Sequence, residues 1–246
     1  MNIAIVLAGG TGTRLGSSIP KQYTRVRDKM IITYCLETFA KAAEIDGIWI
    51  VADETWIDDI ASEANRQVFG DDGAIVGAQI LGYSAPGANR QLSIWNALAD
   101  IEVAIDAVGG SLANADPASM NIMIHDAARP FLTTEMISTY FDALEGYDGV
   151  MPVLPMKDTV YMSEDGRAVS ALIDRARVYA GQAPEIYRYD MYKKACEALL
   201  PDKIMQINGS TEVAVMAGMH IAMVPGDESN FKITTKADLE RAEERL

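Results

Sequence analysis

The first loop of the chain carries residue types that bind anions. Residues 7–23 read LAGGTGTRLGSSIPKQY, with four glycines, Arg14 and Lys21. Glycines allow a backbone to approach a ligand closely, and backbone N–H groups beside fixed cations can hold a triphosphate. The loop therefore predicts phosphoryl or nucleotidyl transfer, with Arg14 and Lys21 stabilising the charge that develops on the attacked phosphorus.

Other glycine-rich loops fit the sequence less well. A Walker P-loop is excluded because no Gly-Lys-Ser/Thr follows at the required spacing. A dinucleotide fingerprint needs a third glycine where Leu15 stands, and Asp53 lies too far along the chain for the acidic residue of that motif. A glycine-rich turn with solvated charges remains the structural alternative, but it leaves Arg14 and Lys21 without a role.

The composition of the chain excludes several classes of binding partner and cellular setting. The chain of 246 residues has 35 acidic and 21 Lys and Arg residues, a net charge of −14, which argues against nucleic acid. No apolar run is long enough to cross a membrane. The two cysteines, Cys35 and Cys196, do not suggest a disulfide framework, so we expect a reduced, cytoplasmic setting.

The hydrophobic pattern alternates between strands and helices, which predicts an α/β fold with a mainly parallel sheet and helices on both faces. Ligands in such sheets bind at the carboxyl ends of the strands. We expect one domain over residues 1–246, with about 153–178 projecting as an arm. Strands are expected at 2–7, 47–52, 74–81, 122–126, 149–154 and 220–224, a hairpin at 158–170, and helices at 29–43, 55–68, 91–107, 134–145, 187–199, 211–219 and 236–246.

The first loop and later segments resemble one enzyme family. LAGGTGTRLG…PKQY is similar to the signature of the cytidylyltransferases that act on sugar-alcohol phosphates, namely 2-C-methyl-D-erythritol 4-phosphate and ribitol 5-phosphate. The resemblance continues in order through GANRQLSI, HDAARPF, KDT, YAGQAPE and NFKITTKADL, which together span nearly the whole chain. It implies a Rossmann-like nucleotidyltransferase fold and transfer of CMP from CTP to a polyol phosphate, with release of pyrophosphate.

The resemblance also assigns roles to residues of the CTP site. Arg14, Lys21 and Lys232 match catalytic positions that contact phosphate. Asp126 is expected near the ribose, a Mg²⁺ ion or the acceptor, and a carboxylate suits Mg²⁺. Arg90 is expected to orient its loop, and His125 to be structural rather than a base. The nucleotide-binding positions are Ala8, Gly9, Gly10, Gly87, Ala88, Ser93 and Asp126.

A second group matches the acceptor site. Arg129 is expected to face the acceptor, while Thr159 and Arg175 match positions that bind its phosphate. In the family these last two lie on an arm that reaches into the partner subunit, which implies a homodimer with arm exchange. No catalytic base is required, because the acceptor phosphate is itself an anionic nucleophile.

The acceptor side departs from the family pattern. Gln182-Ala183-Pro184-Glu185 stands where Gln-Thr-Pro-Gln is usual, and Thr211 replaces an acid. The spacing around Tyr179 and Gly181 slightly favours ribitol 5-phosphate, whereas Ser93 is more similar to the 2-C-methyl-D-erythritol 4-phosphate enzymes. A nucleotide-binding protein that has lost transfer activity is a further alternative, which the retained Arg14 and Lys21 disfavour.

Overall fold

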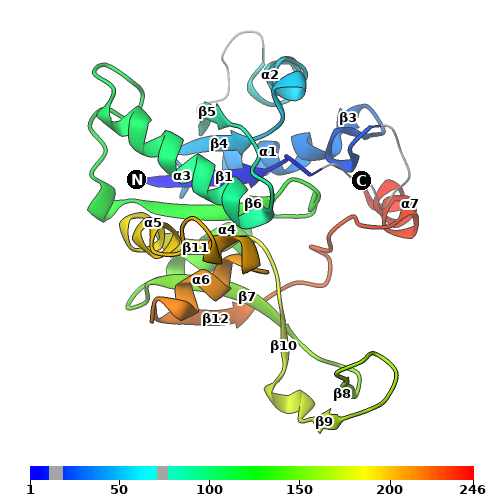
Figure 1. Cartoon of the computed structure of the whole chain (residues 1–246). Coiled ribbons are helices and arrows are strands. Elements are labelled where there is room, and N and C mark those ends of the chain that lie inside the picture. Colours follow the sequence, from blue (N-terminus) through cyan, green and yellow to red (C-terminus); the bar gives the residue numbers. More distant parts are fainter. Residues whose placement is uncertain (11–18, 71–76) are drawn as a thin grey trace.

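A mixed eight-stranded sheet forms the centre of the computed structural model, which describes residues 1–10, 19–70 and 77–246 (Figure 1). The strand order is β10-β7-β11-β6-β1-β4-β5, and β12 pairs with β7. The strands are β1 (Asn2–Leu7), β4 (Gly47–Val51), β5 (Gln79–Ser84), β6 (Asn121–Asp126), β7 (Gly149–Pro155), β10 (Tyr179–Gly181), β11 (Glu185–Arg188) and β12 (Ile221–Pro225).

The parallel strands β6, β1, β4 and β5 form the part of the sheet that positions the first loop. Leu7, the last residue of β1, pairs with Asp126 on one side and with Val51 on the other. The three strands therefore end at the same level, and the segments that follow them share one edge of the sheet. The predicted fold class is confirmed, and Asp126 lies directly beside the start of the glycine-rich loop.

Helices cover both faces of the sheet, as expected from the alternating pattern. Along β1, Ala4 and Val6 face one buried cluster, and Ile3 and Ile5 face the other. The first cluster includes side chains of α1 (Ile31–Lys41), α2 (Ile57–Ala64) and α4 (Thr134–Asp142). The second includes side chains of α3 (Arg90–Asp106), α5 (Tyr189–Glu197) and α6 (Ser210–Met216).

A third, smaller cluster joins the C-terminal helix α7 (Lys236–Arg245) to the short strand β2 (Arg25–Val26), which pairs with β3 (Lys29–Met30), and to the start of α1. Val26 and Ile233 are fully buried in it. This packing fixes the segment before α7, which carries Lys232, against the region that follows the first loop. No helix in the part of the chain described by the structure is long and apolar enough to cross a membrane.

The stretch predicted as a helix over 187–199 begins instead as a strand. β11 lies antiparallel between β6 and β7, and α5 starts only at Tyr189. Ile186 and Tyr187 are both fully buried but pack into opposite clusters, which is the side-chain alternation of a strand with two covered faces. Pairing with distant strands decides this conformation. The strand predicted at 74–81 was also misplaced, since β5 spans Gln79–Ser84.

The predicted arm projects from the sheet at the lower edge of Figure 1. It leaves β7, forms the antiparallel pair β8 (Val160–Met162) and β9 (Ala171–Ile173), and returns through β10. The second strand of this hairpin lies just beyond the predicted range of 158–170. Tyr161 and Leu172, a cross-strand pair of the hairpin, are 60% and 66% exposed.

We predict that Gly149→Ala destabilises the fold by about 2–3 kcal/mol, the usual cost of overpacking a core. Gly149 lies between β11 and β12, and a Cβ there would lie 2.6 Å from the carbonyl oxygen of Ile186 and 2.7 Å from the ring of Tyr187. Urea denaturation measures the loss. Gly209→Ala is the control, since nothing lies within 4 Å of its added Cβ, and it should cost no more than about 1 kcal/mol. Equal losses would contradict the steric argument.

Candidate active site

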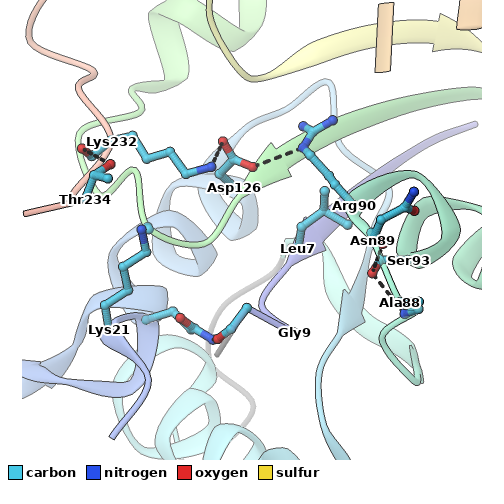
Figure 2. A pocket seen from close by; sticks show the side chains of 14 residues that line it. Leu7, Gly9, Lys21, Ala88, Asn89, Arg90, Ser93, Asp126, Lys232 and Thr234 are labelled. Atoms are coloured by element: carbon cyan, nitrogen blue, oxygen red, sulfur yellow. Dashed lines mark hydrogen bonds and ion pairs between the residues drawn. The ribbon is translucent and has the colours of Figure 1, made fainter. Parts of the chain in front are cut away.

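A pocket of about 420 Å³ opens at the carboxyl ends of the parallel strands, where the fold predicts a ligand site (Figure 2). Segments far apart in the sequence meet around it: the end of β1, the start of α3, the end of β6 and the segment before α7. Its lining comprises Leu7, Gly9, Gly10, Lys21, Gln22, Gly87, Ala88, Asn89, Arg90, Ser93, Asp126, Ala128, Lys232 and Thr234.

The loop after β1 contributes Gly9 and Gly10 to the pocket, but Ala8 differs from the expectation. The Ala8 amide donates to the carbonyl of Val51 at 2.8 Å, and its own carbonyl accepts from Gln22 and from the Tyr23 hydroxyl. This peptide continues the sheet and has no N–H left for a nucleotide. Gly9 is required by close approach, because a Cβ there would lie 2.3 Å from Pro86.

Two of the three expected catalytic cations, Lys21 and Lys232, line the pocket. Lys21 lines the pocket from a short 3-10 helix, Lys21–Tyr23. Figure 2 shows its side chain rising toward the segment that carries Lys232 and Thr234, which also line the pocket. The structure thus brings together two lysines that are more than 200 residues apart. Arg14 lies outside the described residues.

Asp126 is the centre of the pocket's charges. Its Oδ2 lies 3.0 Å from Lys232 Nζ and 3.4 Å from Arg129 Nε, and its Oδ1 lies 3.5 Å from Arg90 Nε. Burial alone would raise the pKa of Asp126, but these three cations hold it well below its usual range. The carboxylate therefore stays ionised at any physiological pH.

Arg129 supports this arrangement from behind the pocket. Its Nη1 donates to the carbonyl of Asn230 at 2.7 Å while its Nε faces Asp126. The side chain is not part of the pocket lining, so the structure gives it a bracing contact to the segment before α7. Contact between Arg129 and the acceptor stays a prediction.

Arg90 and Glu185 form the part of the site that sequence reasoning undervalued. Arg90 begins α3, and its Nη2 lies 3.4 Å from Glu185 Oε2, while its Nη1 donates to Ser210 Oγ at 2.7 Å. Burial, helped by the nearby Asp126 carboxylate, raises the pKa of Glu185, and Arg90 offsets only part of this effect. The signal was present in the sequence as an unexpected acid at 185 and an arginine at the pocket loop, but nothing local paired them.

The wall formed by Gly87, Ala88 and Ser93 is rigid. The Gly87 amide donates to Ser93 Oγ at 3.0 Å, and this hydroxyl donates to the Asn89 carbonyl at 2.9 Å. Asn89 also caps α3 by accepting from the Leu92 amide at 2.7 Å. A side chain on Gly87 would collide with Leu92, since its Cβ would lie 2.4 Å away.

Two expected acceptor residues do not join the pocket. Thr159 and Arg175 are exposed on the arm, where Arg175 Nη1 donates to the carbonyl of Lys157 at 2.6 Å. Within one chain the arm leaves the carboxyl end of β7 and extends below the sheet in Figure 1. Among the described residues, no group of three or more His, Cys, Asp or Glu side chains could hold a metal ion by itself.

Comparison with known proteins gives a consistent result. Residues 2–246 match the family described as 2-C-methyl-D-erythritol 4-phosphate cytidylyltransferase. The enzyme of that name from Rubrobacter xylanophilus is 30% identical over 243 residues, which cover 98% of this chain and 93% of that protein. A solved structure, 4-diphosphocytidyl-2C-methyl-D-erythritol synthase from Anaerococcus prevotii, has a TM-score of 0.78 and 24% identity, with 100% of this chain and 95% of that one covered. At that identity it supports the fold alone.

A relative that is named for a different activity is also similar to this chain. The bifunctional ribulose 5-phosphate reductase/CDP-ribitol pyrophosphorylase Bcs1 of Haemophilus influenzae is 30% identical over 248 residues, covering 97% of this chain. The chain spans about half the length of such bifunctional relatives, 55% of one and 46% of another.

We predict that His125 makes the stability of the fold depend on acid pH. Burial lowers its pKa to about 4, whereas an unfolded histidine titrates near 6.5. Between these values the unfolded state binds a proton that the folded state does not, so the free energy of unfolding falls as pH drops from 7 to 4. The loss reaches up to about 3 kcal/mol, since a tenfold change in proton affinity is worth about 1.4 kcal/mol.

Urea unfolding of His125→Gln across this range should show a loss smaller by that amount. The matched control is His220→Gln at the exposed second histidine, which should follow the wild type. A His125→Gln slope equal to that of the wild type would mean that His125 binds its proton equally well in the folded and unfolded states.

Proposed function

The chain belongs to the 2-C-methyl-D-erythritol 4-phosphate cytidylyltransferase family and is a nucleotidyltransferase, and from this premise we propose that it transfers CMP from CTP to 2-C-methyl-D-erythritol 4-phosphate. A phosphate oxygen of the acceptor forms a bond to the α-phosphorus. The bond from that phosphorus to the bridging oxygen of the β-phosphate breaks, and pyrophosphate leaves with the electron pair. The observation that carries the proposal is a pocket with two lysines opposite a rigid wall of small residues.

The choice of acceptor rests on the relatives. The sequence motifs slightly favour ribitol 5-phosphate, but the family match and the two relatives of which this chain spans 93% and 95% support 2-C-methyl-D-erythritol 4-phosphate better. The Haemophilus influenzae relative keeps ribitol 5-phosphate as the second candidate. Both acceptors are short polyols that end in a phosphate, so the same cations can serve either.

Lys21 and Lys232 are proposed to act on the triphosphate. The five-coordinate α-phosphorus gains negative charge, and fixed cations in a partly closed pocket stabilise that charge more in the transition state than in the ground state. Lys232 is 36% exposed, so a ligand can reach its ammonium group while it still contacts Asp126. Arg14 is proposed to act with them.

Ser93 supports recognition of cytosine. Its single O–H is used on the Asn89 carbonyl and one lone pair is used by the Gly87 amide. The hydroxyl oxygen therefore has one acceptor position left and no donor for a ligand. An acceptor suits the exocyclic amine of cytosine and opposes the corresponding carbonyl of uracil, which favours CTP over UTP.

The pocket residues fit a Mg²⁺ ion held mainly by the substrate. Mg²⁺ commonly binds one or two carboxylates together with substrate phosphates, and Asp126 is an ionised carboxylate in the pocket lining. Asp126 would hold the ion, and the ion would neutralise part of the triphosphate charge. The positions of Lys21 and Lys232 serve the same purpose from the protein side.

Thr159 and Arg175 are proposed to complete the acceptor site of a second copy. The exposed apolar pair Tyr161 and Leu172 on the same arm supports contact with another chain. In this arrangement each pocket receives the Arg175 cation from the partner subunit, which explains why the arm lies away from its own pocket. The cytoplasmic location expected from the sequence stays a prediction.

The first experiment is pyrophosphate release with CTP and Mg²⁺. We expect turnover with 2-C-methyl-D-erythritol 4-phosphate to exceed turnover with ribitol 5-phosphate, and UTP to be a poor donor. A clear preference for ribitol 5-phosphate would instead place the chain with its Haemophilus influenzae relative. Tight CTP binding without release from either acceptor would contradict the proposed transfer.

Arm exchange has its own test, based on two inactive variants. We predict that Lys21→Ala and Arg175→Ala each lower kcat/KM by about 100-fold, as expected for loss of a cation that binds the reacting phosphates. In a purified Lys21→Ala/Arg175→Ala heterodimer, the intact Lys21 and the intact Arg175 meet in one of two sites, so about half of wild-type activity should return. An inactive heterodimer would mean that each arm serves its own chain.

A further inference from the structure

Arg90 lies between two carboxylates and forms no short ion pair with either of them. Its Nε is 3.5 Å from Asp126 Oδ1, and its Nη2 is 3.4 Å from Glu185 Oε2. Its Nη1 donates to Ser210 Oγ at 2.7 Å, and that hydroxyl donates to Glu185 Oε1 at 2.8 Å. One guanidinium thus links the start of α3 to β6, β11 and α6.

Both ion-pair distances exceed the 2.7–2.9 Å typical of a charge-assisted hydrogen bond between a guanidinium and a carboxylate. The carboxylates of Asp126 and Glu185 are only 11% and 12% exposed, so solvent screens their pull on Arg90 weakly. The position of Arg90 is therefore a balance between two anions, and loss of either charge would draw the guanidinium toward the other.

The position of Arg90 between these two anions decides whether Oδ1 of Asp126 is available to a ligand in the pocket. Its Oδ2 contacts Lys232 and Arg129, whereas its Oδ1 faces Arg90 at the longer distance of 3.5 Å. If Arg90 closed onto Asp126, Oδ1 would be filled by the guanidinium. Asp126 would then have fewer lone pairs left for a substrate hydroxyl or for a cation bound by the substrate.

We propose that Glu185 is a positioning residue for CMP transfer, holding Arg90 off Asp126 so that Oδ1 of Asp126 stays available to the bound substrates. The proposal rests on the transfer reaction proposed above and adds a residue outside the pocket lining. Glu185 acts through its charge and through Arg90, without touching the substrates.

The neighbouring Thr211 adds no charge to this corner of the structure. Its Oγ1 lies 2.8 Å from the Tyr187 hydroxyl, so it makes a neutral contact. Glu185 on β11 is thus the acid that faces Arg90 from this side.

Three variants test the role of the charge. Glu185→Gln keeps the shape and removes the charge, Glu185→Asp keeps the charge on a shorter side chain, and Ser210→Ala removes the neutral contact to the same two residues. We expect Glu185→Gln to lower kcat/KM for CTP by about tenfold or more, Glu185→Asp to retain more activity than Glu185→Gln, and Ser210→Ala to lose less than about threefold. The dissociation constant for CTP, measured by calorimetry without acceptor, should follow the same order.

A merely structural role predicts the opposite order. Glu185→Gln, which fills the same volume, would then retain more activity than Glu185→Asp, and activity would follow the melting temperature of the variants. That order would overturn the proposal, as would a Glu185→Gln variant as active as the wild type. In both cases turnover by the wild type would still support the transfer reaction. A wild type that does not bind CTP would overturn both.

Discussion

The carboxylate of Asp126, held among three cations at the end of β6, is the interaction on which the site depends. It is buried, and it stays ionised because Arg90, Arg129 and Lys232 surround it. A chain with net charge −14 thereby keeps several positive groups at one edge of its sheet. Without this anion the same cations would repel one another, and the three segments that carry them would lose their common contact.

The register of the sheet makes this convergence possible. β1 and β6 end level with each other, so the glycine loop after Leu7 begins beside Asp126. α3 starts at the same edge and brings Arg90, while packing of α7 with β2 and the start of α1 fixes the segment that carries Lys232. The glycines and small residues of the lining let a ligand approach the backbone closely. The positive charges determine where an anionic part of that ligand would bind.

The departures from the family pattern have different physical meanings in the structure. Ala183 is only 3% exposed, and its carbonyl accepts from the Asn230 side chain, so it is part of the support beneath Lys232. Glu185 is offset by Arg90 and does not simply add negative charge to the acceptor site. The residues at positions 183 and 185 therefore do not indicate which acceptor the protein uses.

The sequence by itself determined the fold class and the central parallel strands, because apolar runs ending in glycine or polar residues are local signals. Most of the residues around the pocket were assigned by the resemblance of the sequence motifs to the family. Only the tertiary structure decided that β11 inserts antiparallel between β6 and β7, that the Ala8 amide is used by the sheet, and that Arg90 pairs with Glu185 across 95 residues. These features depend on which distant segments become neighbours, and the free energy of such contacts comes from burial and charge pairing that no local pattern records.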